Sequence, residues 1–183
     1  ALEDGAELVV LGRRSPKIDG VEFVPFELGQ DIDPSVIQGV DAVVHFAAAD
    51  LENEDASDLN ITGSKILIDA AKSASVKTFI YTSSQSARED APTKYGRDKW
   101  ALEGLFGPDF GIILRPGFVY GRYAKGAYGN LCSLLAKFPI IPIIGADEPV
   151  QPIYIDDLCH AILQASTMPS AIGHMYNLGA EHP

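Results

Sequence analysis

Short apolar runs alternate with segments of helical periodicity along this 183-residue chain. The apolar runs are rich in Val, Ile and Phe and alternate little with polar residues, as expected for strands that are buried on both faces. Strands that alternate with helices pair in parallel, and the connecting helices cover both faces of the sheet. The sequence therefore predicts an α/β fold with a doubly wound parallel sheet, whose strands lie at residues 7–12, 21–26, 41–47, 77–82 and 111–115.

Four helices are expected between and after these strands. Residues 58–72 place Ile61, Ile66, Leu67 and Ala70 on one stripe, which is typical of a helix that packs on a sheet. Acidic side chains favour the first turn of a helix, so Asp156 or Asp157 is expected to begin the last one. The other helices are predicted at residues 93–105 and 130–137.

Charge and cysteine content exclude several classes of function. The formal net charge is −11, which disfavours nucleic acid and anionic membranes as partners because both require a basic surface. Cys132 and Cys159 lack neighbours at metal-binding spacing, so we expect no metal site and no structural disulfide. No apolar run is long enough to span a bilayer. We therefore expect a cytoplasmic protein that acts on a small-molecule substrate.

Tyr95 and Lys99 form the first candidate for catalysis. They stand four residues apart in a predicted helix and so share one face of it. A tyrosine with a pKa of about 10 is a poor acid or base at neutral pH, but a fixed ammonium nearby favours the phenolate. The pair therefore indicates acid–base catalysis by Tyr95, although a surface lysine beside a half-buried tyrosine would have the same spacing.

Ser84 strengthens this interpretation. It ends a run of three hydroxyl residues, from Thr82 to Ser84, that follows a buried strand. Ligands of open α/β sheets bind outside the carboxyl ends of the strands, which is where these hydroxyls would lie. Ser84 could orient a substrate carbonyl or alcohol toward Tyr95, whereas Thr82 and Ser83 are expected to cap the strand end.

Seven motifs, in this order along the chain, resemble the extended short-chain dehydrogenases/reductases of the NAD-dependent epimerase/dehydratase family. They are LVVLGRR, VDAVVHFAAA, LNITGSKILIDAA, FIYTSS, YGRDK, ILRPGFVYG and QPIYIDDL. The resemblance implies a Rossmann-like sheet and a catalytic trio of Ser84, Tyr95 and Lys99. It also implies an enzyme in which Tyr95 moves a proton while hydride passes between nicotinamide and a nucleotide-linked sugar.

The resemblance also assigns residues to the cofactor and to the scaffold. Cofactor binding is expected at Tyr95 and Lys99 and along three further segments. Asn60, Asp156 and Asp157 are expected to be structural, the two aspartates as a helix cap, and His45 is expected to be a core histidine. The three segments expected to bind the cofactor are as follows: Glu27 with Leu28 at the adenine, Phe46 with Ala47 and Ala48 in the loop along the dinucleotide, and Pro116 with Gly117 beside the nicotinamide.

The choice between NAD and NADP depends on the residues after the strand at 7–12. Enzymes that use NAD often have an acidic residue there, which binds the ribose 2′-hydroxyl. This chain has Gly12 followed by Arg13 and Arg14, and a guanidinium can pair bidentately with a 2′-phosphate. NADP is thus favoured over NAD, unless both arginines are merely solvated.

Three features depart from the family pattern. The Gly-rich turn that binds the pyrophosphate and the strand before it are missing, so we expect truncation or disorder before residue 1. Ser84 and Tyr95 are unusually close in sequence. Phe118 occupies a position where many relatives acting on sugar nucleotides have Asn. We expect one domain over residues 1–183. Residues 117–155 and 168–183 are expected to contribute to a small, partial substrate lobe.

Two alternatives to the sugar-nucleotide enzyme therefore remain open. Phe118 favours an NADP-dependent reductase of a hydrophobic carbonyl compound, such as a sterol or a phenolic ketone. The second alternative is a non-catalytic dinucleotide-binding sensor or assembly subunit, although such relatives typically lose the Tyr or the Lys. Family members often dimerise through the helices near 58–72 and 93–105, so a homodimer involving Trp100 is also expected.

Overall fold

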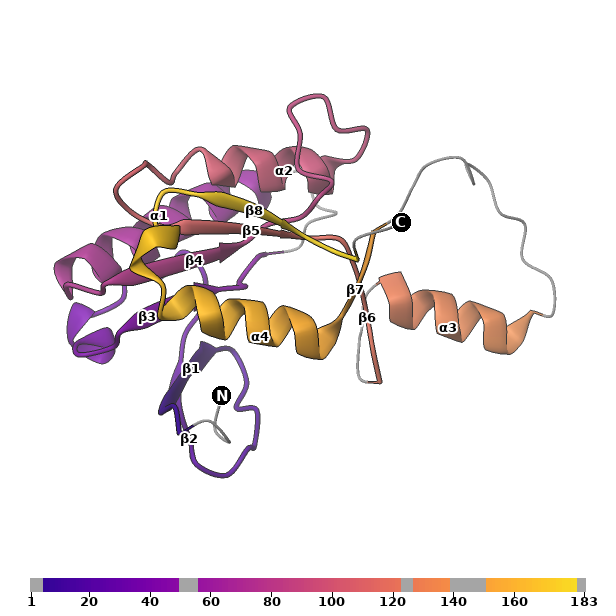
Figure 1. Cartoon of the computed structure of the whole chain (residues 1–183). Helices are drawn as coiled ribbons and strands as arrows, with labels where there is room; N and C mark the ends of the chain where they lie inside the picture. Colours follow the sequence, from indigo (N-terminus) through magenta and orange to yellow (C-terminus); the bar gives the residue numbers. More distant parts are fainter. Residues whose placement is uncertain (1–4, 50–55, 123–126, 139–150, 181–183) are drawn as a thin grey trace.

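A four-stranded parallel sheet forms the centre of the molecule (Figure 1). The computed structural model describes residues 5–49, 56–122, 127–138 and 151–180. The central strands, in spatial order, are β3 (Ala42–His45), β4 (Thr78–Thr82), β5 (Ile112–Pro116) and β8 (Met175–Leu178). All neighbouring strands run parallel, as the alternation of strands and helices predicted.

Two further parallel pairs accompany this sheet. The strands β1 (Leu8–Gly12) and β2 (Val21–Pro25) pair with each other, but neither is hydrogen-bonded to β3. The other pair, β6 (Phe118–Tyr120) and β7 (Pro152–Tyr154), joins residues that are far apart in sequence and was not predicted.

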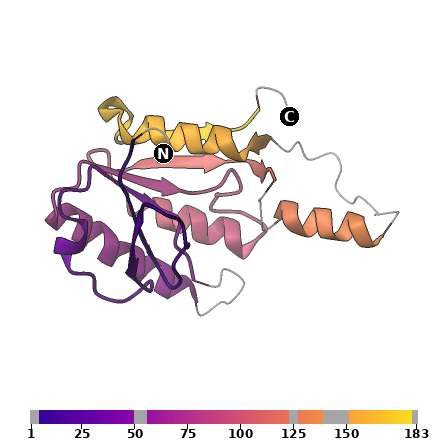
Figure 2. The ribbon, with the colours of Figure 1, turned by 90° about the horizontal axis from the view of Figure 1, so that it is seen from below.

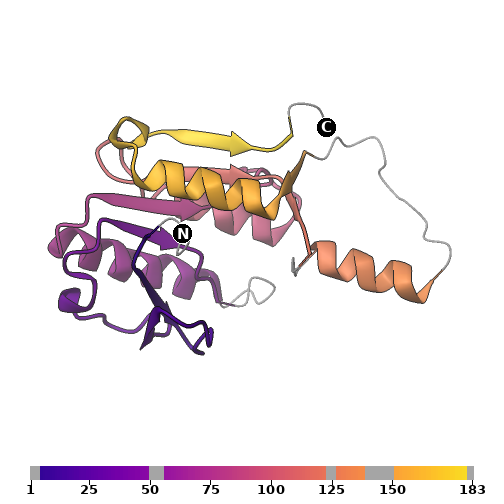
Figure 3. The ribbon, with the colours of Figure 1, turned by 60° about the horizontal axis from the view of Figure 1, so that its bottom comes forward.

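Helices cover both faces of the central sheet (Figures 2 and 3). On one face lie α1 (Ala56–Ser73) and α2 (Lys94–Glu103), and on the other lies α4 (Ile155–Ser166). Side chains alternate along β4, so that Phe79 packs with α1 while Ile80 packs with α4. This confirms the doubly wound arrangement, because one strand contributes to a separate apolar core on each side.

The segments expected in the substrate lobe occupy different places. The helix α3 (Ala127–Lys137) extends away from the central sheet beside β6 (Figure 1). In contrast, β8 pairs with β5 and forms one edge of the central sheet, although residues 168–183 were expected to contribute to the lobe. Of residues 139–150, also expected there, nothing is described. The lobe assignment of residues 117–155 therefore stays a prediction.

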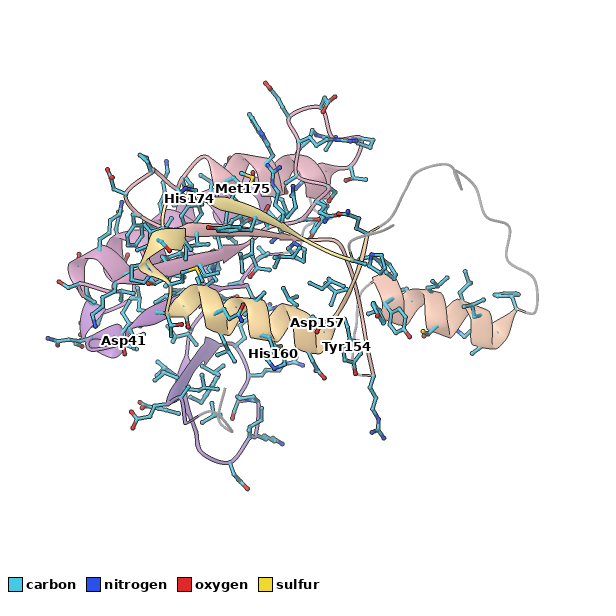
Figure 4. The ribbon with its side chains drawn as sticks, in the orientation of Figure 1. Asp41, Tyr154, Asp157, His160, His174 and Met175 are labelled. Atoms are coloured by element: carbon cyan, nitrogen blue, oxygen red, sulfur yellow. The ribbon has the colours of Figure 1, made fainter. Side chains whose placement is uncertain are left out.

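The start of α4 corrects one expectation. Asp156 and Asp157 lie in its first turn, whereas Tyr154 occupies the N-cap position and makes no capping hydrogen bond with its side chain. Figure 4 shows Tyr154 and Asp157 at this end of the helix, next to β7. The two carboxylates can still interact favourably with the helix dipole, but they are not the cap. Short 3-10 helices cover Pro34–Ile37 and Pro169–Ala171.

Within the described ranges, none of the helices combines the length and the apolar character needed to cross a membrane.

Candidate functional site

The predicted catalytic residues lie at the carboxyl end of β4 and on the adjacent helix α2. The helix begins after Thr93, whose hydroxyl accepts a hydrogen bond from the backbone N–H of Gly96 at 3.2 Å. A Cβ at Gly96 would lie 2.4 Å from the carbonyl oxygen of Ser86, so the first turn of α2 packs directly on the loop after β4. This contact brings Tyr95 close to Ser84.

Lys99 is anchored to the strand beneath α2. Its side chain is only 6% exposed, and its Nζ donates a hydrogen bond of 2.8 Å to the carbonyl oxygen of Thr82. The ammonium lies 5.0 Å from the ring centroid of Tyr81 and 5.9 Å from that of Tyr95. Burial lowers the pKa of Lys99 to about 8, and the charge of Glu103 opposes this effect.

Tyr95 is 38% exposed, which leaves its ring open to a substrate. The side chain of Ser84 interacts with the hydroxyl of Tyr95 by a hydrogen bond. The Oγ of Ser84 also shares a hydrogen bond of 2.8 Å with the Oγ of Ser86. Partial burial raises the pKa of Tyr95, and the hydrogen bond with Ser84 lowers it by less. The lowered pKa expected from Lys99 is thus not found in this structure, because burial outweighs the other influences on the phenol.

The loop after β3 has small and exposed side chains. Phe46 is 59% exposed, Ala47 is exposed and Ala48 is half-buried. The backbone N–H of Ala49 donates a hydrogen bond of 2.7 Å to Oδ1 of Asn60 on α1. Asn60 therefore supports the backbone of this loop, which agrees with its expected structural role.

His45 ends β3 immediately before that loop. It is buried, and its Nε2 shares a hydrogen bond of 2.9 Å with the Oγ of Ser64. Burial, together with the positive charge of Lys99, lowers the pKa of His45 to about 4. The side chain is consequently neutral at physiological pH and behaves as the core histidine that was expected.

Pro116 and Gly117 form a tightly packed turn at the end of β5. The backbone N–H of Gly117 donates a hydrogen bond of 2.8 Å to the carbonyl oxygen of Leu178. A Cβ at Gly117 would lie only 1.9 Å from the carbonyl oxygen of Gln151. The turn is thus held between β8 and the residue before β7, and only glycine fits there.

The remaining cofactor candidates lie on the β1–β2 unit. Arg13 and Arg14 follow β1, are exposed, and line a cavity of about 560 Å³. Glu27 is exposed after β2, while Leu28 packs against α1 at Gly63. The structure thus gathers Ser84, Tyr95 and Lys99 at β4, and places Arg13 and Glu27 on the separate strand pair.

Two parts of the site were not anticipated from the sequence. Glu103 on α2 forms an ion pair with Arg115 on β5, close to the predicted catalytic residues. Its position one helical turn after Lys99 was a sequence signal that could have indicated a charged partner on the same helix face. A second cavity, of about 400 Å³, lies between β6, β7, α4 and the end of β8, and its lining includes Tyr120, Tyr154, Asp157 and Asn177. The residues that the structure describes contain no cluster of His, Cys, Asp and Glu able to hold a metal ion.

The sequence matches a family model and several curated proteins. The model of the 3-beta hydroxysteroid dehydrogenase/isomerase family matches residues 29–103. A mitochondrial NADH dehydrogenase [ubiquinone] 1 alpha subcomplex subunit 9 from Dictyostelium discoideum is 27% identical over 145 residues, which are 76% of this chain and 39% of that protein. The subunit 9 of Mus musculus is 26% identical, over 76% of this chain and 38% of the relative. The chain thus spans well under half the length of these relatives.

Solved structures share the fold at low sequence identity. MoeE5 in complex with UDP-glucose and NAD has a TM-score of 0.79 and 18% identity, over 98% of this chain and 70% of that one. A UDP-glucose-4-epimerase from Stenotrophomonas maltophila, with NAD and formylated UDP-arabinopyranose bound, has a TM-score of 0.78 and 20% identity, over 99% of this chain and 73% of that one.

These comparisons correct one expectation and leave another without support. The predicted cytoplasmic location is wrong, because the curated relatives are mitochondrial proteins by name. The preference for NADP finds no support in the solved neighbours, which hold NAD. The resemblance itself finds support: the family model matches residues 29–103, and the solved neighbours, which include NAD-dependent epimerases and dehydratases, share the Rossmann-like fold of the extended short-chain dehydrogenases/reductases.

Proposed function

We propose that the chain carries the catalytic centre of an NAD(P)-dependent oxidoreductase of the epimerase/dehydratase type. The observation that supports this most strongly is the arrangement of Ser84, Tyr95 and Lys99 at the carboxyl end of β4. Tyr95 is accessible, Ser84 interacts with it, and Lys99 is fixed below it by Thr82. Such an accessible phenol beside a hydroxyl and an ammonium can exchange a proton with a substrate alcohol or carbonyl.

The proton and the hydride leave the substrate by separate routes. In the oxidising direction the phenolate of Tyr95 takes the proton of the substrate hydroxyl, and in the reducing direction the phenol returns it to the carbonyl oxygen. Ser84 donates a hydrogen bond to that oxygen and holds it toward Tyr95. A bound nicotinamide supplies or accepts the hydride. Because Lys99 has three N–H donors, it can bind both Thr82 and a ribose hydroxyl.

The residues around the site fit a dinucleotide. Phe46 and Ala47 lie in the exposed loop after β3. The side chain of Ala47 is only a methyl group, so a cofactor could approach the backbone there. Arg13 and Arg14, which follow β1, line a cavity and present two guanidinium groups to it. Glu27, Leu28, Ala48, Pro116 and Gly117 are proposed to complete the binding site, in the roles expected from the family pattern.

The arginines provide a test of cofactor preference. If a guanidinium binds the 2′-phosphate, replacing both (Arg13→Ala/Arg14→Ala) should raise the Kd for NADP about tenfold and leave the Kd for NAD unchanged. Isothermal titration of the full-length protein measures both constants. Arg88→Ala is the control, since it removes an exposed guanidinium from a different loop. Equal losses for NAD and NADP would show that the arginines do not select the cofactor.

Lys99→Met tests the electrostatic role of the lysine. A cation stabilises the phenolate, so its removal should raise the pKa of Tyr95 further. The rate of substrate oxidation requires the phenolate, and its rise with pH should therefore move to higher pH in the variant. The measurement is kcat as a function of pH. A profile that does not move would mean that Lys99 only positions the cofactor.

The substrate is proposed to belong to one of two classes, nucleotide-linked sugars or hydrophobic carbonyl compounds. Solved neighbours bind UDP-glucose or a UDP-pentose, which supports a nucleotide-linked sugar. The matched family model is named for 3-beta hydroxysteroids, and Phe118 favours a hydrophobic carbonyl compound. Full-length protein should be incubated with NAD or NADP and a panel of UDP- and dTDP-sugars, hydroxysteroids and aromatic ketones, with products identified by chromatography and mass spectrometry. Turnover on neither class would refute the proposal.

The curated relatives favour a second candidate, a non-catalytic subunit of a mitochondrial NADH dehydrogenase. In that case the protein would bind a dinucleotide without turnover and would associate with the respiratory complex. Tagged full-length protein should then comigrate with NADH dehydrogenase activity on native gels of mitochondrial membranes. Retention of Tyr95 and Lys99 argues for the enzyme, since an assembly role requires neither side chain.

A further inference from the structure

Glu103 is a buried carboxylate just outside the catalytic trio. It ends α2, one helical turn after Lys99, and is 7% exposed. Burying a charge is costly unless hydrogen bonds and an opposite charge compensate it. The partners of this carboxylate therefore indicate what it stabilises.

Two strands provide those partners. The hydroxyl of Ser83, which follows β4, donates a hydrogen bond of 2.5 Å to Oε1 of Glu103. Arg115 on β5 donates from Nε to Oε1 at 2.7 Å and from Nη2 to Oε2 at 2.5 Å. The paired guanidinium and carboxylate thus make a bidentate contact, which restricts orientation as well as distance.

Each partner adjoins a residue of the proposed active site. Ser83 precedes Ser84, and Arg115 precedes Pro116. Glu103 itself shares a helix with Tyr95 and Lys99. We propose that Glu103 is a positioning residue, whose carboxylate joins α2 to the ends of β4 and β5 and so holds Ser84, Lys99 and the Pro116 turn in register.

The same carboxylate supports the charge of Lys99. Burial lowers the pKa of Lys99 to about 8, and the negative charge of Glu103 raises it in opposition. His45 is neutral, because burial and Lys99 lower its pKa to about 4. The rings of Tyr81 on β4 and Tyr95 on α2 also face the ammonium of Lys99. Of the charged groups on the neighbouring elements, Asp98 on α2 is paired with Lys94, and Arg115 on β5 is paired with Glu103.

The active-site role of Glu103 rests on the proposed oxidoreductase function, but its effect on Lys99 can be measured without turnover. In Glu103→Gln the negative charge is lost while the size of the side chain is kept. Titration of the Lys99 ¹³Cε and ¹⁵Nζ signals by NMR, assigned by their absence in Lys99→Arg, should show a midpoint lowered by about half to one pH unit. Asp41→Asn is the control. Asp41 precedes β3 (Figure 4), and the variant removes the carboxylate of an exposed ion pair with Lys77. It should leave the midpoint of Lys99 unchanged.

A double variant covers the case in which Glu103→Gln does not fold. Removal of one partner leaves an unpaired buried charge, whereas neutral replacement of both partners is often tolerated. Glu103→Gln/Arg115→Met should therefore fold and should still lower the midpoint of Lys99, but by less than Glu103→Gln, because the positive charge of Arg115 is removed as well. An unchanged midpoint in the folded variant would overturn the inference.

Turnover provides the second measurement. If the parent protein is active, Glu103→Gln should lower kcat about tenfold with little change in KM, because it disturbs the alignment of reacting groups and not the binding of substrate. A parallel loss in kcat and in the amount of folded protein, with an unchanged midpoint of Lys99, would indicate a merely structural role. A parent protein without turnover but with the lowered midpoint would refute the enzymatic proposal and support the inference about Glu103.

Discussion

Tyr95→Phe should abolish most of the turnover while leaving dinucleotide binding intact. The variant removes the hydroxyl that is proposed to exchange a proton with the substrate, and it keeps the ring that lies 5.9 Å from Nζ of Lys99. Positioned acid–base groups contribute about 10²- to 10⁴-fold to a rate, so kcat should fall by about that range. Steady-state kinetics and fluorescence titration with NAD or NADP measure the two effects separately.

Tyr176→Phe is the matched control for this experiment. Tyr176 lies on β8 and is 39% exposed, compared with 38% for Tyr95, so that the two changes remove the same hydroxyl at similar exposure. The control should keep the activity of the parent protein. Full activity in Tyr95→Phe would contradict the role of Tyr95 as the acid or base.

Gly117→Ala should lower the free energy of unfolding more than any other substitution considered for this chain. The added Cβ would lie 1.9 Å from the carbonyl oxygen of Gln151, and a backbone atom cannot move aside as the end of a side chain can. Gly117 also donates a hydrogen bond to Leu178, so a shift of the turn would weaken the contact with β8. Overpacking of this kind costs about 2–3 kcal/mol. The Tm should therefore fall by roughly 5–10 °C in differential scanning calorimetry.

Gly107→Ala separates this clash from the general effect of replacing glycine. A Cβ at Gly107 would meet no atom within 4 Å, and its backbone does not require the left-handed region. Its Tm should stay close to that of the parent protein. A Tm of Gly117→Ala equal to that of Gly107→Ala would show that the turn can relax away from Gln151.

Most elements of the central fold follow from short-range sequence patterns. The apolar runs before Ser84 and Pro116 became β4 and β5, and the predicted helix at 93–105 became α2. Such patterns are readable because burial on both faces of a parallel strand demands a continuous apolar run. In contrast, the pairing of β6 with β7 depends on the path of the chain between Tyr120 and Pro152, which no local pattern specifies.

The electrostatics of the site were less predictable. The spacing of Tyr95 and Lys99 indicated a lowered pKa for the tyrosine, whereas partial burial raises it in the folded chain. The same burial lowers the pKa of Lys99 to about 8. Burial depends on all the segments that pack around a side chain, so neither direction can be read from a four-residue spacing. The compartment was also beyond reach of composition, since net charge does not distinguish mitochondrial from cytoplasmic proteins.

The residue pattern alone was sufficient for the α/β class, for the shared face of Tyr95 and Lys99, and for the position of Ser84 at a strand end, because helical and strand periodicities place neighbours along the chain. The folded structure was needed to show that Glu103 pairs with Arg115 and Ser83 and that Gly117 lies against Gln151. These contacts join residues on different elements, and their distances are set by the packing of helices on the sheet. The proposed catalytic pair is thus a local feature of the sequence, whereas its proposed positioning depends on tertiary contacts.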